Sequence, residues 1–400
     1  MSEPLVIIGN GMAAAKLCEE LSARALGRHA VAVVGAEPTL AYNRVLLSEV
    51  LAGRMPAADT ELKTAGWWRA QGVTLLYGTP AAAIDRAARA VVLADGQRLP
   101  FSRLVLATGS HPIRLPLPGA DLPGVTTFRD LADVDALLKA ARPGVKAVVI
   151  GGGLLGLEAA TGLAGAGVDT TLVHVMDRLM ERQLDATAAR LLREAVEAQG
   201  VTVELNAHSE AVTGETCATG LQLKDGRLLE ADLIVMACGV RPNADLARAA
   251  GLACNRGVIV DDRLSTDDPD IFALGECAEH RGLAYGLVAP AYEQARVLAA
   301  HLAGRPAAYE GSTVSTNLKV SGVPVFSAGD ISGTGTEDIV LNDRGLKIYR
   351  RLFVRDGVLQ GAVLFGDTAD GLYYLDLITN RTPIAELRTE LAFGRPALAA

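Results

Sequence analysis

Short apolar runs, each followed by a glycine-rich turn and then by helical spacing, recur through the first two thirds of the chain. The first run, Leu5–Ile8, is followed by two glycines, and apolar residues then stand at Ala13, Leu17 and Leu21. Continuous apolar runs of this length are typical of strands buried on both faces of a parallel sheet, and a spacing of about four residues is typical of a helix. The next run, Ala30–Gly35, completes a strand–helix–strand unit of about thirty residues, the length that such a unit needs.

The same unit returns about 140 residues further along the chain. Residues 147–150 form the strand-like run, three consecutive glycines make the turn, and a helical stretch leads to a second strand at Thr170–Val175. An internal repeat of this kind implies two nucleotide-binding domains. We expect three further buried strands, at Arg103–Gly109, Asp232–Gly239 and Ile271–Gly275.

From about Gly311 onward the pattern changes to stretches separated by hairpin turns. Residues 316–330 and Lys347–Leu364 are typical of antiparallel strands, and a helical stretch follows from Thr368. We therefore predict an α/β protein with two Rossmann-like nucleotide-binding domains and a C-terminal α+β domain. The predicted domains are a discontinuous first domain at 1–112 and 242–310, a second domain at 113–241 and a C-terminal domain at 311–400.

The composition of the chain limits the kinds of partner and metal site that it can have. The net charge of -8, with no basic stripe, argues against nucleic acid. The five cysteines are scattered and form no C-x-x-C pair, which excludes a local dithiol and the close spacing of zinc or iron–sulphur sites. Single cysteines fit a reducing cytosol, and the N-terminus, with Glu3 before its apolar run, is not a secretory signal. We expect a cytoplasmic protein and make no prediction of its oligomeric state.

One segment, Ala147–Val168, has the length and apolar character of a membrane span, with Glu158 as its one charge. Seven of its residues are glycines, three of them consecutive. A buried strand, a tight turn and a buried helix explain this spacing better than a membrane helix does. We therefore predict no contact with a membrane.

The first glycine turn has the spacing G-x-G-x-x-A. Gly9 allows the tight turn, Gly11 lets the backbone approach a diphosphate, and Ala14 permits close packing of helix on strand. The N–H groups at the start of the helix then face the diphosphate. The alternative is a glycine turn without a ligand. The candidate binding residues of this turn are Gly9, Gly11, Met12, Ala13 and Ala14.

In such folds an acid at the end of the second strand holds the adenosine ribose. Glu37 is the candidate in the first unit, one position later than usual, with Ala36 at the usual place. The alternative is that Glu37 is an ordinary exposed acid of the loop.

The second glycine turn, Gly151–Gly156, has the full spacing G-x-G-x-x-G. At the end of its second strand the usual acid is absent and His174 stands there. Since an acid at that place would repel the 2′-phosphate of NADPH, both NADH and NADPH remain candidates. Arg178 and Arg182 follow, either near the nucleotide or at a solvated helix end. The candidate binding residues are Gly151, Gly153, Leu154, Leu155, Gly156, Glu158, His174 and Arg178.

The stretch GECAEH places a carboxylate, a thiol and an imidazole at the end of an apolar strand. Gly275 ends the strand, and Glu276 lies where open α/β sheets bind ligands. Cys277 is expected to pack as a small apolar residue, and His280 is expected to lie at the surface. A zinc site is not expected, because two further ligands are missing in range. Pro290 is expected to begin the next helix, whose positive end would face an anionic ring.

Taken together, these motifs resemble those of the FAD- and NAD(P)H-dependent pyridine nucleotide reductases. LVIIGNGMAA and FALGECA are similar to the two FAD signatures of that family, and AVVIGGGLLGLE is similar to its NAD(P)H signature. LVLATGSHP, with Thr108 and Gly109, and VMACGVRPN, with Gly239, are similar to its two crossings between domains. AYNRVLLSEVLAG, LMERQLD, STNLKVSGVPVFSAGD and LFGDTADGLYYL further resemble the flavin portion of bacterial assimilatory NAD(P)H nitrite reductases and the electron-transfer subunits of nitrate assimilation.

The resemblance implies a glutathione-reductase type of fold, with FAD in the first domain and NADH or NADPH in the second. By resemblance, Glu276 hydrogen-bonds the ribityl chain of the flavin, Arg44 and Lys319 contact FAD, and Ala81 meets the adenine side through its backbone. The remaining contacts implied are Thr108, Gly109, Gly275 and Pro290 for FAD and Gly239 for NAD(P)H.

Three features depart from the family pattern. No cysteine occurs in AYNRVLLSEVL, where flavin disulphide reductases and NADH peroxidases keep their redox thiol, so those activities are not expected. Related ferredoxin reductases carry lysine where this chain has Glu49. Nitrite reductases of this type continue into cysteine clusters for iron–sulphur and sirohaem, and none follows here, so we expect that this chain does not reduce nitrite alone.

The resemblance therefore implies an NAD(P)H-dependent FAD reductase that passes electrons to a separate redox protein. The partner would be a component of nitrate or nitrite reduction or a ferredoxin-like protein. Glu158 is the candidate catalytic residue, orienting the nicotinamide amide, with a packing or surface role as the alternative. The alternative functions are an NAD(P)H oxidase, a ferredoxin or rubredoxin reductase, a nucleotide-binding sensor without turnover, and a fragment of a full nitrite reductase.

Overall fold

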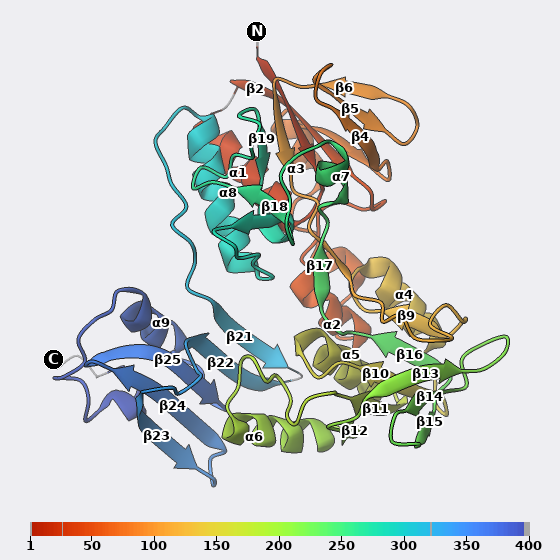
Figure 1. Ribbon diagram of the computed structural model, residues 1–400, viewed down its shortest axis with the longest axis vertical. Helices are drawn as coiled ribbons and strands as arrows, with labels where there is room; N and C mark the ends of the chain where they lie inside the picture. The colour runs from red at the N-terminus through yellow and green to blue at the C-terminus, as the bar shows by residue number, and fades with distance from the viewer. Residues whose placement is uncertain (1, 26, 321, 396–400) are drawn as a thin grey trace. The chain divides into compact units, whose positions relative to one another are not determined.

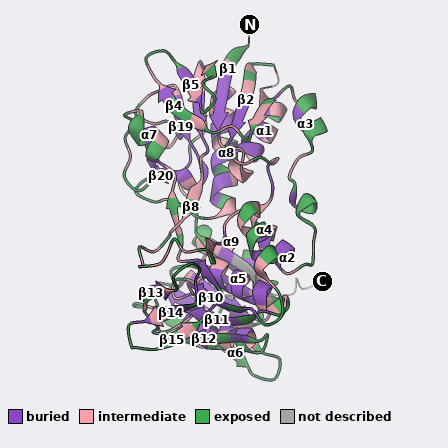
Figure 2. Cartoon of the chain, turned by 90° about the vertical axis from the view of Figure 1, so that its right-hand side faces the viewer, coloured by how far each residue is buried: buried purple, intermediate pink, exposed green. Residues whose placement is uncertain are grey.

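The apolar run near the N-terminus forms β1 (Glu3–Ile8), the middle strand of a five-stranded parallel sheet (Figure 1). β1 pairs with β2 (His29–Gly35) on one side and with β7 (Arg103–Leu106) on the other. The outer strands, β3 (Thr74–Tyr77) and β19 (Ile271–Ala273), complete the order β19-β7-β1-β2-β3. Successive side chains of β1 point to opposite faces, and those from Leu5 to Ile8 are buried on both, which explains an apolar run without alternation (Figure 2).

The computed structural model describes residues 2–25, 27–320 and 322–395, and of residues 317–320 it describes the backbone alone. The chain divides into two compact units. Unit 1 comprises Met1–Leu47, Pro56–His111 and Val240–Ser312, and unit 2 comprises Ser48–Met55, Pro112–Gly239 and Thr313–Ala400. All but two residues of each of the predicted second and third domains fall within unit 2, and the predicted domain boundaries stay predictions.

In unit 1, helices α1 (Met12–Arg24) and α8 (Val288–Leu302) pack against each other beside the sheet (Figure 1). A three-stranded antiparallel sheet, two short strand pairs and short helices complete the unit. They are η1 (Arg44–Leu46), η2 (Ala57–Thr60), α3 (Ala65–Ala70), β4 (Ala81–Asp85), β5 (Ala90–Leu93), β6 (Arg98–Pro100), β8 (Ser110–Pro112), which ends at the unit boundary, β17 (Val240–Pro242), α7 (Asp245–Ala249), β18 (Val258–Val260), η3 (Gly275–Cys277) and β20 (Ala278–His280).

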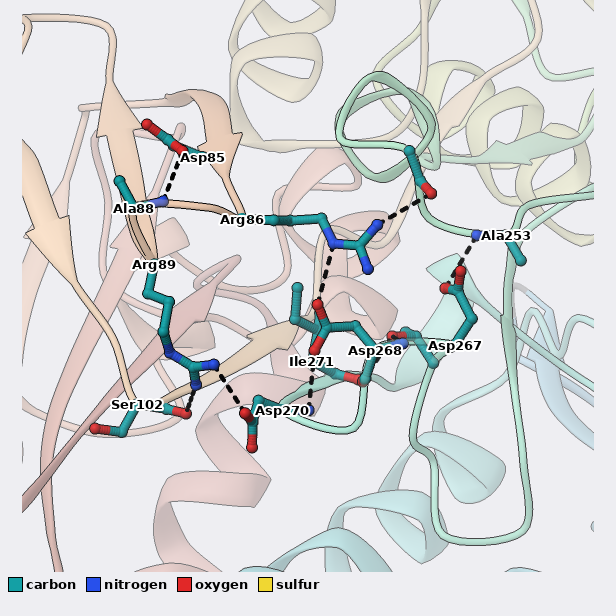
Figure 3. Close-up of polar contacts among 12 residues, drawn as sticks. Asp85, Arg86, Ala88, Arg89, Ser102, Ala253, Asp267, Asp268, Asp270 and Ile271 are labelled. Carbon is teal, nitrogen blue, oxygen red and sulfur yellow. Dashed lines mark hydrogen bonds and ion pairs between the residues drawn. The ribbon is translucent and has the colours of Figure 1, made fainter.

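Ion pairs join two distant stretches of unit 1, Pro56–His111 and Val240–Ser312 (Figure 3). Arg86 Nε donates to Asp268 Oδ2 at 3.0 Å and Arg89 Nη1 donates to Asp270 Oδ2 at 2.8 Å. Arg86 also donates to the carbonyl oxygen of Gly251 at 3.2 Å. The β4–β5 hairpin is thereby tied to the loop that enters β19, and the discontinuous stretches form one body.

Unit 2 contains the second parallel sheet, built as the first one is. Its middle strand is β10 (Lys146–Ile150), followed by α5 (Leu154–Gly165) and β11 (Asp169–Val173). With β12 (Val201–Glu204), β16 (Leu233–Met236) and β9 (Val125–Thr127) the order is β12-β11-β10-β16-β9. The other elements here are α2 (Leu47–Leu51), α4 (Leu131–Ala140), α6 (Ala186–Glu197) and the three-stranded sheet β13 (Ser209–Thr213), β14 (Gly220–Leu223) and β15 (Leu228–Glu230).

Helix α5 is apolar on most of its surface because it is enclosed. It contacts β10, β11, β12 and β16 of its own sheet and β21 (Ser315–Val320) of the C-terminal part. At Gly162 a Cβ would lie 2.9 Å from a methyl group of Leu51, so the glycine makes room for α2. Within the described residues, no helix has the length and apolar composition needed to cross a membrane.

The C-terminal part of unit 2 is an antiparallel sheet with one helix packed on it. The strands are β21, β22 (Val323–Gly329), β23 (Glu337–Asp343), β24 (Ile348–Arg355) and β25 (Val358–Phe365), in the order β21-β22-β25-β24-β23. Asp356 and Gly357 join β24 to β25 with positive φ at both positions, as a two-residue hairpin turn of type I′ requires. Helix α9 (Gly371–Thr379) buries Tyr374 against this sheet, and η4 (Leu391–Phe393) follows.

Asp185 joins the two parts of unit 2. Its Oδ1 accepts the N–H of Ala188 at 2.8 Å and so caps α6. Its Oδ2 accepts the hydroxyl of Tyr349 at 2.6 Å and Arg351 Nη1 at 3.2 Å, both from β24. Arg351 also pairs with Asp338 of β23 at 2.7 Å. One buried carboxylate therefore connects a helix cap to the C-terminal sheet.

The start of α8 corrects one expectation. The helix begins at Val288, with Leu287 as its N-cap in an extended conformation, so the prediction that Pro290 begins it was wrong by two residues. Pro290 still lies in the first turn, where its missing N–H has no helical partner to lose. The expected strands at Thr170–Val175 and Asp232–Gly239 are also shorter, because the backbone leaves the sheet at the turns that follow Val173 and Met236.

We predict that Asp185→Ala lowers the free energy of unfolding by about 2–4 kcal/mol, because it removes both a helix cap and the carboxylate that accepts the buried Tyr349 hydroxyl. Chemical denaturation of the variant and the wild type measures this difference. Asp338→Ala is the matched control, since it removes the other, 32% exposed partner of Arg351 and should cost about 1 kcal/mol or less. Equal losses in the two variants would contradict the role given to Asp185.

Candidate functional site

The two glycines of the first turn meet different requirements. Gly9 has a φ of +116°, and a Cβ there would lie 2.0 Å from the carbonyl oxygen of Ala107, so only glycine fits. Gly11 has an extended backbone, and no described atom beyond its chain neighbours lies within 4 Å of where its Cβ would be. The turn is therefore closed against its own sheet at Gly9 and open at Gly11.

Helix α1 begins at this opening with Met12, Ala13 and the fully buried Ala14. Gly11 is its N-cap, and no side chain that the structure describes caps its free N–H groups. Close to the turn, Asn10 Oδ1 and Thr39 Oγ1 are buried without a hydrogen-bond partner among the described residues. A polar, anionic ligand such as a diphosphate fits this cradle, because it would meet both the helix N-terminus and unpaired polar atoms.

Glu37 lies in the loop after β2, within a cluster of three side chains. The Tyr42 hydroxyl donates to Glu37 Oε2 at 2.6 Å, and Arg44 bonds the same carboxylate. The Arg44 guanidinium also lies over the Tyr42 ring, 4.8 Å from its centroid. Two of the predicted FAD contacts therefore share one cluster at the carboxyl edge of the sheet.

Thr108 and Gly109 follow β7 at the same edge. Asn243 holds them: Thr108 Oγ1 donates to the carbonyl oxygen of Asn243 at 2.7 Å, and Asn243 Nδ2 donates back to that of Thr108 at 2.8 Å. Asn243 N–H also donates to the carbonyl oxygen of Gly109 at 2.9 Å. The Ser110 hydroxyl donates to Glu276 Oε2 at 2.6 Å. The first crossing between domains thus orients Glu276, the acid predicted to bond the ribityl chain of FAD.

Gly275 begins η3, two residues after the end of β19, and has a φ of +78°. Its N–H donates at 2.7 Å to Oε1 of Gln294, a residue of α8 that is 1% exposed. A Cβ on Gly275 would lie 3.1 Å from the Cβ of Ala13, so the strand end meets α1 closely. Pro290 is buried in the first turn of α8. The predicted FAD residues from both ends of unit 1 therefore gather at one edge.

The thiol and the imidazole of this stretch are not chemical groups of the site. Cys277 is fully buried, its Sγ contacts the carbonyl oxygens of Leu106 and Leu274, and burial raises its pKa. The expected packing role is confirmed. The prediction that His280 lies at the surface was wrong, because the ring is 1% exposed and bonds Asp262 at 2.8 Å. Among the described residues, no cluster of three metal-ligating side chains occurs.

Two predicted FAD contacts lie farther from the first turn in sequence. Ala81 begins β4 and pairs with Leu93 of β5. Lys319 lies in β21, but its side chain is outside the described part of the structure. Their roles stay predictions.

The second turn repeats the geometry of the first. Gly151 has a φ of +128°, and a Cβ there would lie 2.3 Å from the carbonyl oxygen of Ala237. Gly153 is the N-cap of α5, with open space, as far as the chain is described, where its Cβ would be. A Cβ on Gly156 would lie 1.8 Å from the carbonyl oxygen of Gly151, so only glycine lets the helix come this close.

The start of α5 also fits a dinucleotide. Leu154 and Leu155 open the helix, and its first turn carries no acid that would repel a diphosphate. His174 follows β11 directly, is buried, and accepts the N–H of Gly152 at Nδ1 over 3.0 Å. Arg178 pairs with its neighbour Asp177 at 3.0 Å.

At the second crossing, Gly239 has a φ of +101° and accepts the N–H of Ile113 at 2.9 Å. The described residues of unit 2 thus bring its predicted nucleotide contacts to the carboxyl edge of the second sheet.

Glu158 lies on α5, two residues beyond the turn. Burial raises the pKa of its carboxyl group to about 8, and the negative charge of Glu49 adds to the rise. Arg54 pairs with Glu49 at 2.6 Å. Glu158 is therefore mostly protonated at neutral pH and is a hydrogen-bond donor there.

Three residues that shape the site were missed by sequence reasoning: Tyr42, Asn243 and Gln294. Asn243 lies within the quoted stretch VMACGVRPN, and Gln294 lies on the helix after Pro290. Their partners lie 135 and 19 residues away, so no local spacing marks them.

We predict that the stability of the protein falls as the pH rises from about 4.5 to about 8, through the carboxyl group of Glu158. The folded state holds this proton more tightly than the unfolded chain does, so deprotonation penalises the folded state. Glu158→Gln removes the titration and should be more stable than the wild type at pH 9, by of the order of 4 kcal/mol, with little difference at pH 4.5. Glu215→Gln, at an exposed loop position, is the control. A difference that is the same at both pH values would contradict the assignment.

Comparison with known proteins agrees with this geometry. The family described as pyridine nucleotide-disulphide oxidoreductase matches residues 3–299, and the rubredoxin NAD+ reductase C-terminal domain matches residues 315–382. The chain is 46% identical over 384 residues to a nitrite reductase (NAD(P)H) of Bacillus subtilis, covering 96% of this chain and 48% of that protein. It is 43% identical over 391 residues to the assimilatory nitrate reductase electron transfer subunit of Bacillus subtilis, covering 97% and 50%. The chain thus spans about half the length of these curated relatives.

Among solved structures, a ferredoxin reductase from Rhodopseudomonas palustris has a TM-score of 0.91 and 26% identity, covering 98% of each chain. The predicted fold class and the predicted resemblance are confirmed by these matches. FAD and a pyridine nucleotide are the cofactors of such an enzyme. The chain belongs to the pyridine nucleotide-disulphide oxidoreductase family and is an FAD-dependent NAD(P)H oxidoreductase.

Proposed function

We propose that the chain takes electrons from NADH or NADPH onto FAD and passes them to a separate redox protein of nitrate or nitrite assimilation. The observation that carries the proposal is the pair of glycine turns, each closed against its sheet at the first glycine and open at the second. Similarity over nearly the whole chain to a nitrite reductase and a nitrate reductase electron transfer subunit supports the assimilatory role.

In this proposal, unit 1 holds FAD. The N–H groups of α1 beside Gly11 bind the diphosphate, and the first turn supplies Met12, Ala13 and Ala14. Glu37 and Arg44 hold the adenosine end with the backbone of Ala81, and Glu276, oriented by Ser110, accepts from the ribityl chain. The other proposed contacts in unit 1 are Gly9, Thr108, Gly109, Gly275 and Pro290, and Lys319 of β21 is a further proposed contact.

Unit 2 holds the pyridine nucleotide in the same way. The N–H groups of α5 beside Gly153 bind its diphosphate, and Glu158, protonated at neutral pH, donates to the nicotinamide amide oxygen and orients the ring. The other proposed contacts are Gly151, Leu154, Leu155, Gly156, His174, Arg178 and Gly239.

When bound by the residues named above, FAD would accept a hydride from the pyridine nucleotide and would release the electrons singly to the acceptor. The residues of the chain position the two cofactors and shield them, and none is required as an acid or base for hydride transfer. A thiol relay is not part of the proposal, because Cys277 is fully buried and the loop that contains Tyr42 and Glu49 has no cysteine. The cysteines Cys18, Cys217, Cys238, Cys254 and Cys277 are all free, which supports a cytoplasmic location.

A second candidate function is a ferredoxin or rubredoxin reductase. The match of residues 315–382 to a rubredoxin reductase C-terminal domain and the similarity to a ferredoxin reductase favour it. It differs from the first proposal in the acceptor alone. An NAD(P)H oxidase would instead consume oxygen rapidly without any protein acceptor, and a sensor would bind nucleotide without reducing its flavin.

We predict that the protein loaded with FAD is yellow and loses its flavin absorbance when NADH or NADPH is added without oxygen. Electrons should then pass to an assimilatory nitrate or nitrite reductase component faster than to ferredoxin, rubredoxin or oxygen. Anaerobic spectra followed by mixing with each acceptor measure both steps. A protein that binds no FAD, or whose flavin stays oxidised, would sink the proposal.

A further inference from the structure

The residue that ends the second strand of a dinucleotide fold strongly influences which pyridine nucleotide is preferred. An acid there accepts hydrogen bonds from the ribose 2′-hydroxyl and repels the 2′-phosphate of NADPH. In unit 2 this place, directly after β11, belongs to His174. The side chains that His174 contacts therefore decide whether the site carries an acid after all.

Hydrogen bonds fix where the His174 ring carries its proton. The N–H of Gly152 donates to Nδ1 at 3.0 Å, so Nδ1 presents a lone pair. The proton of the neutral ring is then on Nε2, which donates to Glu181 Oε2 at 3.2 Å. A Cβ on Gly152 would lie 2.6 Å from the ring, so the two residues are in close contact. His174 is thus a neutral bridge that holds a carboxylate at its outer end.

The loop that carries Glu181 is anchored on the same glycine turn. The N–H of Met180 donates to the carbonyl oxygen of Gly152 at 3.0 Å, and Met180 is 1% exposed with a φ of +50°. The carbonyl oxygen of Met180 accepts the N–H groups of Gln183 and Leu184 at 2.8 and 2.9 Å. Because Glu181 directly follows Met180, its backbone is fixed against the turn as well as its side chain.

The other charged groups of this loop leave Glu181 as the acid of the turn. The side chain of Asp177 is 63% exposed and pairs with Arg178, whereas that of Glu181 is 23% exposed. Arg182 Nε lies 3.8 Å from Glu181 Oε1, with its side chain 84% exposed in solvent. Without Glu181, the loop would present Arg182 unopposed.

We infer that Glu181 replaces the missing acid of the strand end and makes the second site select NADH over NADPH. This deepens the proposed function and rests on it, since it names the nucleotide that unit 2 takes. The Glu181 carboxylate accepts hydrogen bonds from the ribose hydroxyls and repels a 2′-phosphate, and His174 is the positioning residue that holds it. Removing the carboxylate favours NADPH twice, because it ends the repulsion and frees Arg182.

The test is calorimetric titration of the FAD-loaded protein with NAD+ and NADP+. We expect the wild type to bind NAD+ at least about tenfold more tightly than NADP+, and Glu181→Gln to bring the two constants within about threefold. Glu181→Ala should act in the same direction. Glu194→Gln, an acid on α6 that pairs with Arg190 one turn away, should keep the wild-type ratio. General damage to the fold weakens both nucleotides together and leaves the ratio unchanged.

The inference is overturned if the wild type binds NADP+ as tightly as NAD+, or if both Glu181 variants keep the wild-type ratio. Anaerobic flavin reduction, measured on the same samples, tests the proposed function separately. A ratio that changes as expected in a protein whose flavin is never reduced would uphold the specificity of Glu181 and reject the reductase.

Discussion

Two carbonyl oxygens, those of Ala107 and Ala237, lie where a side chain on the first glycine of each turn would be. In each unit the neighbouring strand therefore comes within reach of the turn only because that glycine has no Cβ. The close contact directs the chain into a helix whose free N–H groups face the carboxyl edge of the sheet. Candidate residues that closely follow the parallel strands, such as Thr108 and His174, lie at that edge, since parallel strands all end there.

The glycine turns and buried strands could be predicted because their signal is local: a short apolar run, a fixed glycine spacing and a helical period. The contacts that complete the site are not local. Asn243 reaches Thr108 across 135 residues, and Asp185 reaches Tyr349 across 164. The burial of His280 was missed for the same reason, since its partner Asp262 lies in another loop. The acid that usually follows the second strand is absent from this chain, and Glu181, which we infer replaces it, lies seven residues beyond His174.

The buried ionisable groups near the two sites position other groups and take no part in a reaction themselves. Glu158 loses its charge to burial, Cys277 is enclosed beneath the strand end, and His174 is a neutral bridge between a glycine turn and a carboxylate. Buried groups of this kind are costly unless they are paired or neutral, and here they are one or the other. Such a site suits hydride transfer between bound cofactors, which needs alignment more than acid–base chemistry.

The central claim is that one chain carries two separate dinucleotide sites. Binding stoichiometry tests it most directly, measured with Gly11→Ala and Gly153→Ala, at positions where the described structure leaves room for a methyl group. The account predicts one FAD and one pyridine nucleotide per chain, with loss of FAD alone in the first variant and of the pyridine nucleotide alone in the second. Competition of both ligands for one site, or loss of both ligands in either folded variant, would contradict it.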